Sequence, residues 1–126
     1  MSELFFNNFE QALKKLTEFC KNFDGTEIQQ AGIIQAFEFT FEQAWKAIQK
    51  KAGTEGVTIA SPKKAFQWAL ENGWLKSTDE QAWIEIFSDR NLTSHTYRAA
   101  MAQQVSQNVI TNHVQQFVNL LVKMKQ

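Results

Sequence analysis

The segment 89–97, with the sequence DRNLTSHTY, carries the side chains best suited to chemistry in this chain. Arg90 lies seven residues after Trp83 and three after Phe87, so the three share one face of a continuous helix. A guanidinium on an otherwise apolar face is costly unless it is paired or used. His95 follows five residues later, about 140° further round the helix. Arg90 and His95 therefore meet only if the helix ends between them or if a second copy of the chain supplies one of the two.

Two interpretations of this segment stay open. In the first, Arg90 is a core arginine that pairs with Glu38 or Glu42 of an earlier helix, and His95 is a surface histidine with satisfied hydrogen bonds. In the second, Arg90 and His95 form an anion site, because arginine binds phosphate oxygens in a fork and histidine exchanges protons near neutral pH. Cleavage of RNA by its own 2′-hydroxyl needs both a base and an acid. A two-fold dimer would bring two histidines and two arginines into one cleft.

Composition limits the other classes of function. The chain has 126 residues, the length of one domain, and we expect residues 1–126 to form a single domain. Lys plus Arg and Asp plus Glu both number 13, and this balance argues against a general nucleic-acid coat but leaves room for a local basic site. One cysteine, Cys20, excludes a disulfide framework and a four-cysteine zinc site. Two histidines make a multi-histidine metal centre within one chain implausible. We therefore expect no metal and no cofactor.

The start of the chain, MSELFFNNFE, is acidic and lacks the apolar run of a signal peptide. No stretch approaches the roughly 18 apolar residues of a membrane span. A single cysteine suits a reducing compartment. We expect a cytoplasmic protein that does not span a membrane.

Helical periodicity extends along almost the whole sequence. A stripe of apolar residues predicts a first helix that ends before Asp24–Gly25, and Thr26 with Gln29 reads as a capping box for the second, which Gly53 and Gly56 end. Further helices are predicted from Ser61–Pro62 to Asn72–Gly73, from a Ser77/Glu80 capping box, and from about 98 or 99 to about 125. No segment alternates with the period of a strand. The sequence predicts an all-α, antiparallel up-and-down bundle of four to five helices.

Two helices have unusual faces. Residues 99–122 contain no charged side chain, and their polar face consists of Gln and Asn with His113. Charge depletion is typical of interface cores, although a bias in the amino-acid usage of the source organism explains it equally well. We expect His113 at an interface or at the surface. In the segment 37–46, Phe39 and Trp45 widen the apolar arc beyond one stripe. We expect both in the core, with a subunit contact as the alternative.

Three segments resemble a known family. FEFTFEQAWK (37–46), SPKKAFQWALENGWL (61–75) and WIEIFSDRNLTSHTY (83–97) are similar to the nucleotidyltransferase substrate-binding proteins, a branch of the HEPN superfamily that includes the HepT toxins. The similarity covers most of the chain, and its most specific part is an arginine, four residues, a histidine, one residue and a tyrosine. The resemblance implies a helical bundle that forms a homodimer and binds a small nucleotidyltransferase encoded beside it.

In the toxin branch, the arginine and histidine form a metal-independent ribonuclease site at the dimer cleft, and the partner antitoxin transfers AMP onto the tyrosine. The resemblance assigns these roles to Arg90, His95 and Tyr97, with single-stranded RNA as the substrate. Asp89 either orients Arg90 or is solvated. Asn91, Thr93 and Ser94 position phosphate or cap helix ends and are assigned no catalytic role. A non-enzymatic adaptor that presents a ligand or Tyr97 to the nucleotidyltransferase is the main alternative, and a structural dimerisation bundle is another.

Overall fold

A computed structural model describes residues 2–126, with side chains from residue 4 onward. Its helices are α1 (Ser2–Lys21), α2 (Glu27–Thr54), α3 (Pro62–Glu71), α4 (Glu80–Leu92), α5 (Ala99–Asn108) and α6 (Val114–Lys125). Two short 3₁₀ turns, η1 (Ser77–Asp79) and η2 (Thr93–His95), flank α4, and a π-helical turn, η3 (Val109–His113), joins α5 to α6. The described residues form an all-α bundle without strands, as the periodicity predicts.

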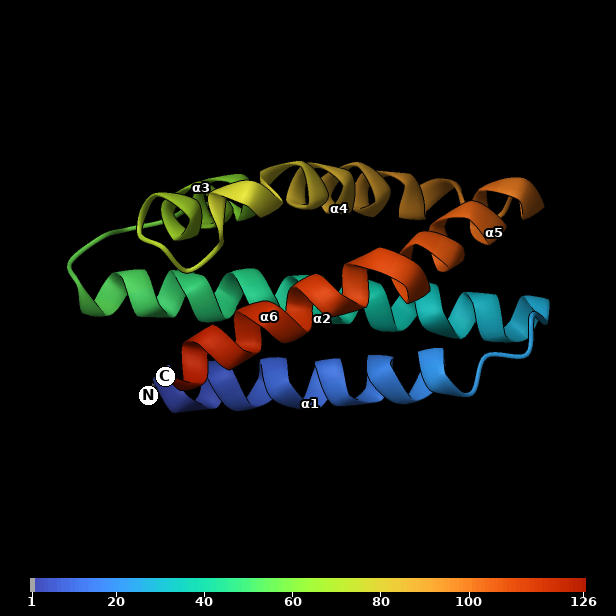
Figure 1. Ribbon diagram of the computed structural model, residues 1–126, viewed down its shortest axis with the longest axis horizontal. Coiled ribbons are helices and arrows are strands. Elements are labelled where there is room, and N and C mark those ends of the chain that lie inside the picture. The colour runs from blue at the N-terminus through green and yellow to red at the C-terminus, as the bar shows by residue number, and fades with distance from the viewer. Residues whose placement is uncertain (1) are drawn as a thin grey trace.

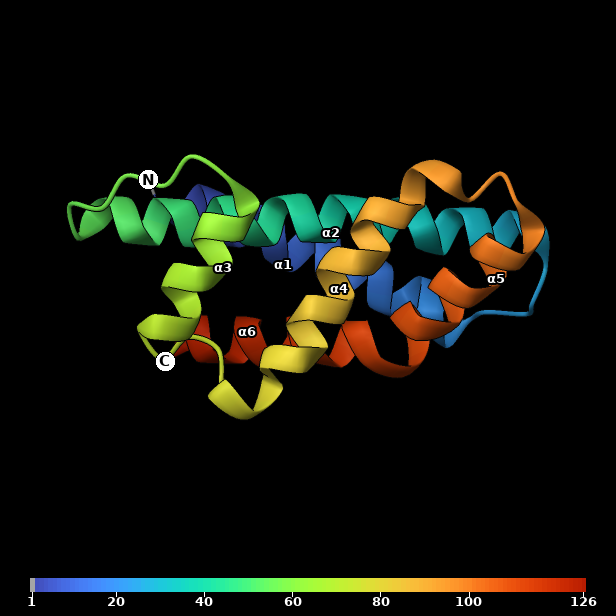
Figure 2. The same cartoon turned by 90° about the horizontal axis from the view of Figure 1, so that it is seen from above.

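The bundle has two layers. Figure 1 shows α1 and α2 as a long antiparallel pair with α6 packed along it. In Figure 2, α3 and α4 cross the top of α2 obliquely. The final helix predicted for residues 98–125 is continuous through α5, η3 and α6, and α4 ends at Leu92, between Arg90 and His95. The end of α4 lies over α2 in Figure 2, so residues near position 90 contact residues near position 38.

Large apolar side chains from α1, α2, α4 and α6 fill the space between the layers. Phe117 of α6 packs edge-on against Phe9 of α1 and Trp83 of α4, with ring centroids 6.4 and 5.5 Å apart. Phe9, Phe37 and Phe117 are fully buried. The core prediction is wrong for Phe39, whose side chain is 58% exposed on the outer face of α2.

The structure confirms some of the predicted helix caps and contradicts others. Ser61 caps α3 by accepting a hydrogen bond from the Lys64 backbone N–H at 3.3 Å, with Pro62 in the first turn. Thr26 caps α2 in the same way, but the Gln29 side chain accepts from the Asp24 N–H and not from that of Thr26. The Ser77/Glu80 capping box is wrong, because Ser77 begins the 3₁₀ turn η1 and makes no capping bond. Gly25 has a φ of 86°, which fits the break predicted there.

Candidate functional site

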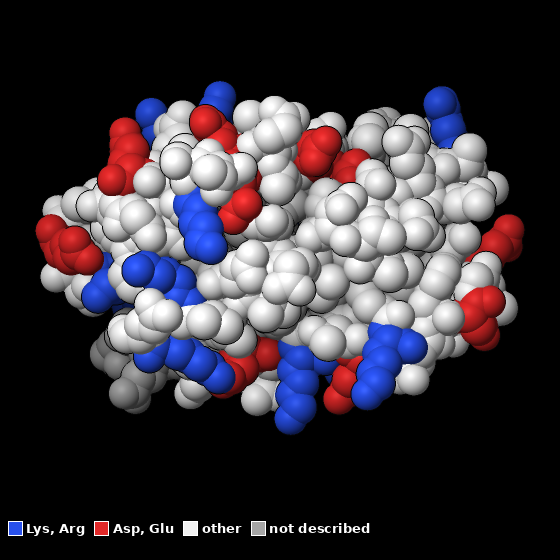
Figure 3. Space-filling model, viewed as in Figure 1, with Lys and Arg blue, Asp and Glu red and all other residues white. Residues whose placement is uncertain are grey.

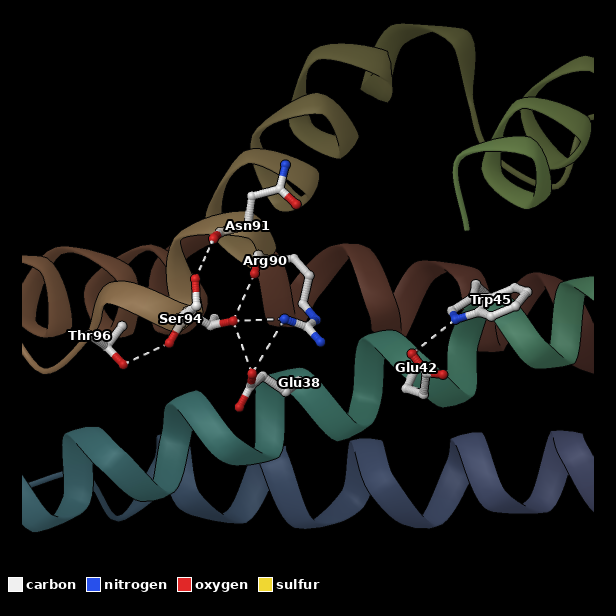
Figure 4. A network of polar contacts seen from close by, with 8 residues as sticks. Glu38, Glu42, Trp45, Arg90, Asn91, Ser94 and Thr96 are labelled. Carbon is white, nitrogen blue, oxygen red and sulfur yellow. Dashed lines mark hydrogen bonds and ion pairs between the residues drawn. The ribbon is translucent and has the colours of Figure 1, made fainter. Parts of the chain in front are cut away.

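Arg90 reaches from the last turn of α4 to Glu38 on α2, as Figure 4 shows. Its Nη1 lies 3.3 Å from Glu38 Oε2 and donates to Thr93 Oγ1 at 2.8 Å. Thr93 Oγ1 also lies 3.0 Å from Glu38 Oε2 and 2.7 Å from the Arg90 carbonyl oxygen, so its single proton goes to one of these acceptors. These three residues, which we call the Arg90 cluster, fix the guanidinium against α2.

The two charged members of the Arg90 cluster are open to solvent, whereas Thr93 is buried. The side chains of Arg90 and Glu38 are each 36% exposed. The guanidinium carbon lies 5.9 Å from the centre of the Phe41 ring, so the apolar side of the group rests on an aromatic face. The ion pair is the one expected from the first interpretation of the sequence. Its exposure leaves the guanidinium accessible to an anion from outside.

His95 and Tyr97 lie just beyond α4, on η2 and the turn that leads into α5. Their ring centroids are 6.4 Å apart, and Tyr97 is 77% exposed. The Arg98 guanidinium carbon lies 5.7 Å from the centre of the Tyr97 ring. In the part of the chain that the structure describes, no hydrogen bond or ring contact joins His95 to Arg90. Within one chain the two predicted site residues are therefore neighbours in sequence without direct contact.

Asp89 points in the opposite direction from Arg90, into the core. Its Oδ2 accepts a hydrogen bond from His113 Nε2 at 2.6 Å and another from Asn108 Nδ2 at 3.0 Å. The side chains of His113 and Asp89 are 2% and 8% exposed, and the imidazole stacks on Phe37. Both expectations for Asp89, orientation of Arg90 and solvation, are wrong, and so is the expected surface or interface position of His113. The buried contact ties the end of α4 to η3, because the wide π turn carries His113 inward.

The other two candidate residues lie apart from the Arg90 cluster. Glu42 accepts a hydrogen bond from Trp45 Nε1 at 3.0 Å and pairs with Lys46 at 3.5 Å, one turn along α2 from Glu38. Asn91 is exposed, and its backbone carbonyl accepts a hydrogen bond from Ser94 Oγ at 3.3 Å. Neither side chain contacts Arg90.

Sequence reasoning missed two contacts of these networks. It considered Thr93 only as a group that positions phosphate or caps a helix end, although its place three residues after Arg90 on the same helical face indicates a contact between the two. Asn108 and its contact with Asp89 had no such signal, because the two residues are 19 apart in the chain. Long-range contacts of this kind depend on how the helices pack.

Charges are unevenly distributed over the surface. Figure 3 shows lysines, arginines and carboxylates around the edge of one face, with a broad uncharged area over α5 and α6. This area corresponds to the uncharged stretch 99–122. From residue 4 onward, no three His, Cys, Asp or Glu side chains lie close enough to hold a metal ion. None of the described helices is long and apolar enough to cross a membrane.

Comparison with known proteins identifies the class of this bundle. The model of the family described as nucleotidyltransferase substrate binding protein like matches residues 4–126. The chain belongs to this family. It also resembles a crystal structure from Thermus thermophilus, with a TM-score of 0.84 and 30% sequence identity over 94% of this chain and 99% of that one. Among curated proteins, none matches the sequence.

Proposed function

We propose that this chain is the HEPN-type partner subunit of a small nucleotidyltransferase in a two-component module of toxin–antitoxin type. Membership of the nucleotidyltransferase substrate-binding family supports the partnership. The observation that carries the proposal is the position of Tyr97, which is the only tyrosine in the chain and is 77% exposed beside His95. A transferase active site can reach the phenol there without any unfolding of the bundle.

The proposed activity is metal-independent cleavage of single-stranded RNA in a homodimer. Arg90 would neutralise the scissile phosphate, and one His95 would take the proton of the 2′-hydroxyl as it attacks phosphorus. The bond from phosphorus to the 5′-oxygen then breaks, and the His95 of the second copy gives that oxygen a proton. The products are a 2′,3′-cyclic phosphate and a free 5′-hydroxyl. The two copies are needed because each contributes one histidine to the pair.

Glu38 acts as a competitor for the RNA phosphate in this mechanism. It pairs with Arg90 at 3.3 Å, and both side chains are 36% exposed. An ion pair at this exposure contributes about 0–1 kcal/mol, so a phosphate displaces the carboxylate at little cost. A phosphate that replaces Glu38 also finds the Thr93 hydroxyl within reach, since Thr93 Oγ1 lies 3.0 Å from Glu38 Oε2 in the free chain.

Modification of Tyr97 would silence this site. The Tyr97 phenolic oxygen attacks the α-phosphorus of ATP, the bond to pyrophosphate breaks, and the phenol proton passes to a base or to water. The resulting AMP group is a bulky anion two residues from His95, so it fills the cleft and competes for Arg90. The Arg98 guanidinium over the Tyr97 ring supplies a positive charge beside the new phosphate.

Intact-mass measurement after co-expression with the neighbouring nucleotidyltransferase tests the partnership. We expect a mass increase of one AMP group on the chain, lost in Tyr97→Phe. If the transferase modifies another substrate but the mass of this chain stays unchanged, Tyr97 is not the acceptor.

RNA cleavage in the presence of a chelator tests the ribonuclease activity. We expect Arg90→Ala and His95→Ala each to abolish cleavage by the unmodified chain. Glu38→Gln frees Arg90 and should raise the affinity for RNA, whereas Glu42→Gln, a control one turn away, should not. If the wild-type chain is inactive and its Arg90→Ala variant still binds the transferase, the chain is an adaptor and not a ribonuclease. The Arg90–Glu38 pair favours that second candidate, because the guanidinium already has a carboxylate partner in the free chain.

A further inference from the structure

A pocket of about 460 Å³ opens between α3 and α4, in the layer that lies above α2 in Figure 1. This volume falls in the range of sites that hold small organic molecules, about 300–1,000 Å³. We call it the α3–α4 pocket. Most of its lining is apolar and comes from Phe66, Leu70, Leu75, Trp83, Ile84 and Phe87. A mostly apolar lining with a few polar groups is typical of sites for flat, partly polar ligands.

Aromatic rings form the inner wall of the α3–α4 pocket. The rings of Phe66 and Trp83 stack with their centroids 4.9 Å apart, and Phe87 meets Phe66 edge-on at 5.2 Å. Phe66 and Trp83 belong to the buried core, so the wall is already in place in the free chain. Ile84, which is 53% exposed, lies at the opening. A heterocyclic base that enters the pocket therefore finds aromatic surface to stack on.

Two carboxamides stand on opposite sides of this wall, Gln67 on α3 and Asn91 on α4. Both side chains are exposed, and neither donates to or accepts from another side chain among the described residues. A carboxamide donates and accepts at once, so it can form a two-bond pair with the edge of adenine. The charged lining residues, Lys63 and Glu80, are one of each sign. The pocket therefore favours a neutral ring with donors and acceptors over a small ion.

The α3–α4 pocket adjoins the Arg90 cluster. The ring of Phe41 on α2 lies 5.6 Å from Phe66 and 5.2 Å from Phe87, and the Arg90 guanidinium carbon lies 5.9 Å from that same ring. Around α4, Arg90 and Asn91 lie about 60° and 40° to either side of Phe87, one turn further along. Figure 4 shows their side chains leaving the last turn of α4 from adjacent positions. A nucleotide whose phosphate contacts Arg90 can therefore reach the pocket with its base.

We propose that the α3–α4 pocket binds an unpaired adenine base of the RNA, in the nucleotide next to the phosphate held by Arg90. The inference rests on the proposed function for the choice of RNA as the ligand. It adds a physical origin of base selectivity, in which Phe87 contributes stacking and Asn91 and Gln67 pair with the edge of the base. A base inside a duplex cannot enter, so the pocket also selects single strands.

Two substitutions remove the carboxamides with little change in side-chain volume. They are Asn91→Leu and Gln67→Met, both at exposed positions, so the fold should tolerate them. Gln81→Met is the matched control, because Gln81 is also an exposed helical glutamine but lies outside the pocket. Far-UV circular dichroism and the midpoint of thermal unfolding check that each variant is folded.

Binding of 2′-O-methyl oligonucleotides separates recognition from cleavage, because these strands have no free 2′-hydroxyl to attack phosphorus. Fluorescence anisotropy compares an oligoadenylate with an oligouridylate of the same length. We expect the wild type and Gln81→Met to bind the oligoadenylate about tenfold more tightly, and Asn91→Leu and Gln67→Met to lose most of this preference. Arg90→Ala should weaken both strands by a similar factor, since a phosphate contact carries no base information. In nitrogen-15 spectra, the side-chain amide signals of Gln67 and Asn91 should shift with the oligoadenylate.

Three results would overturn the proposal. One is equal affinity of the wild type for the two strands, and another is a preference for adenine that survives in both pocket variants. The third is oligoadenylate binding that Arg90→Ala leaves as tight as in the wild type, because the pocket would then be separate from the phosphate site. RNA cleavage is scored separately. A chain that cleaves no RNA but whose adenine preference depends on Asn91 and Gln67 refutes the ribonuclease and leaves the base pocket standing.

Discussion

Replacement of Asp89 by alanine should destabilise the bundle far more than removal of Glu38 from its partly exposed ion pair with Arg90. The Asp89 carboxylate accepts hydrogen bonds from His113 at 2.6 Å and Asn108 at 3.0 Å. His113 Nδ1 already lacks a hydrogen-bond partner, so Asp89→Ala leaves both nitrogens of a buried imidazole unpaired. A donor that loses its acceptor inside a protein costs about 1–3 kcal/mol, and His113 and Asn108 both lose theirs, so we expect a total of about 3–5 kcal/mol. That loss lowers the midpoint of thermal unfolding by roughly 10–20 °C in a domain of this size.

Urea denaturation followed by tryptophan fluorescence measures the effect, with Glu38→Ala as the control. Glu38 belongs to an ion pair whose members are each 36% exposed, so its removal should cost about 1 kcal/mol or less. Asp89→Leu combined with His113→Phe should recover part of the loss, because it removes the two buried polar side chains together and leaves only the half-buried Asn108 amide without its acceptor. An Asp89→Ala variant no less stable than Glu38→Ala would refute the assignment of a stabilising role to this contact.

Three further predictions concern single positions. Ser61→Ala should lower the free energy of unfolding by about 1 kcal/mol, because Ser61 caps α3. Ser77→Ala is the control: Ser77 makes no capping bond, so the change should stay below about 0.5 kcal/mol. Urea titrations compare the two variants. Gly73→Ala should lower stability by about 1 kcal/mol in the same assay, since φ is +78° there. Burial raises the pKa of the Cys20 thiol to about 11, so alkylation by iodoacetamide near pH 8 should be at least about tenfold slower than in the unfolded chain. Because the folded pKa is the higher one, the associated stability is complete below the unfolded pKa and is lost as pH rises toward 11, which alkaline denaturation measures.

The fold was predictable where one local cause determines it. Phe9, Leu13 and Leu16 recur at helical spacing because the same face of α1 is buried, and all three lie in the core. Ser61 and Pro62 start α3 through contacts within four residues. The wrong expectation at Phe39 has a different origin. Periodicity tells which faces are apolar, but it does not tell which of two apolar faces remains uncovered.

The candidate site was predictable only in part. The position of Arg90 on the face of Trp83 and Phe87 indicated a partner on α2, and Glu38 is that partner. The inward turn of Asp89 was not predictable, because it depends on His113, 24 residues away in the chain. The catalytic pairing of Arg90 with His95 across two copies stays a prediction, since it depends on the relation between chains.

The π turn at Val109–His113 has a consequence for insertions and deletions. It takes up one more residue per turn than an α-helix, so η3 accommodates an extra residue while α5 and α6 stay in rotational phase. Deleting one residue there would convert the π turn into an ordinary α-helical turn and leave Phe117 and Leu120 buried. The same deletion within α5 or α6 would rotate every later residue by about 100° around the helix axis. Natural variants should therefore differ in length at this turn and at the links 55–60 and 72–76, and not within α5 or α6.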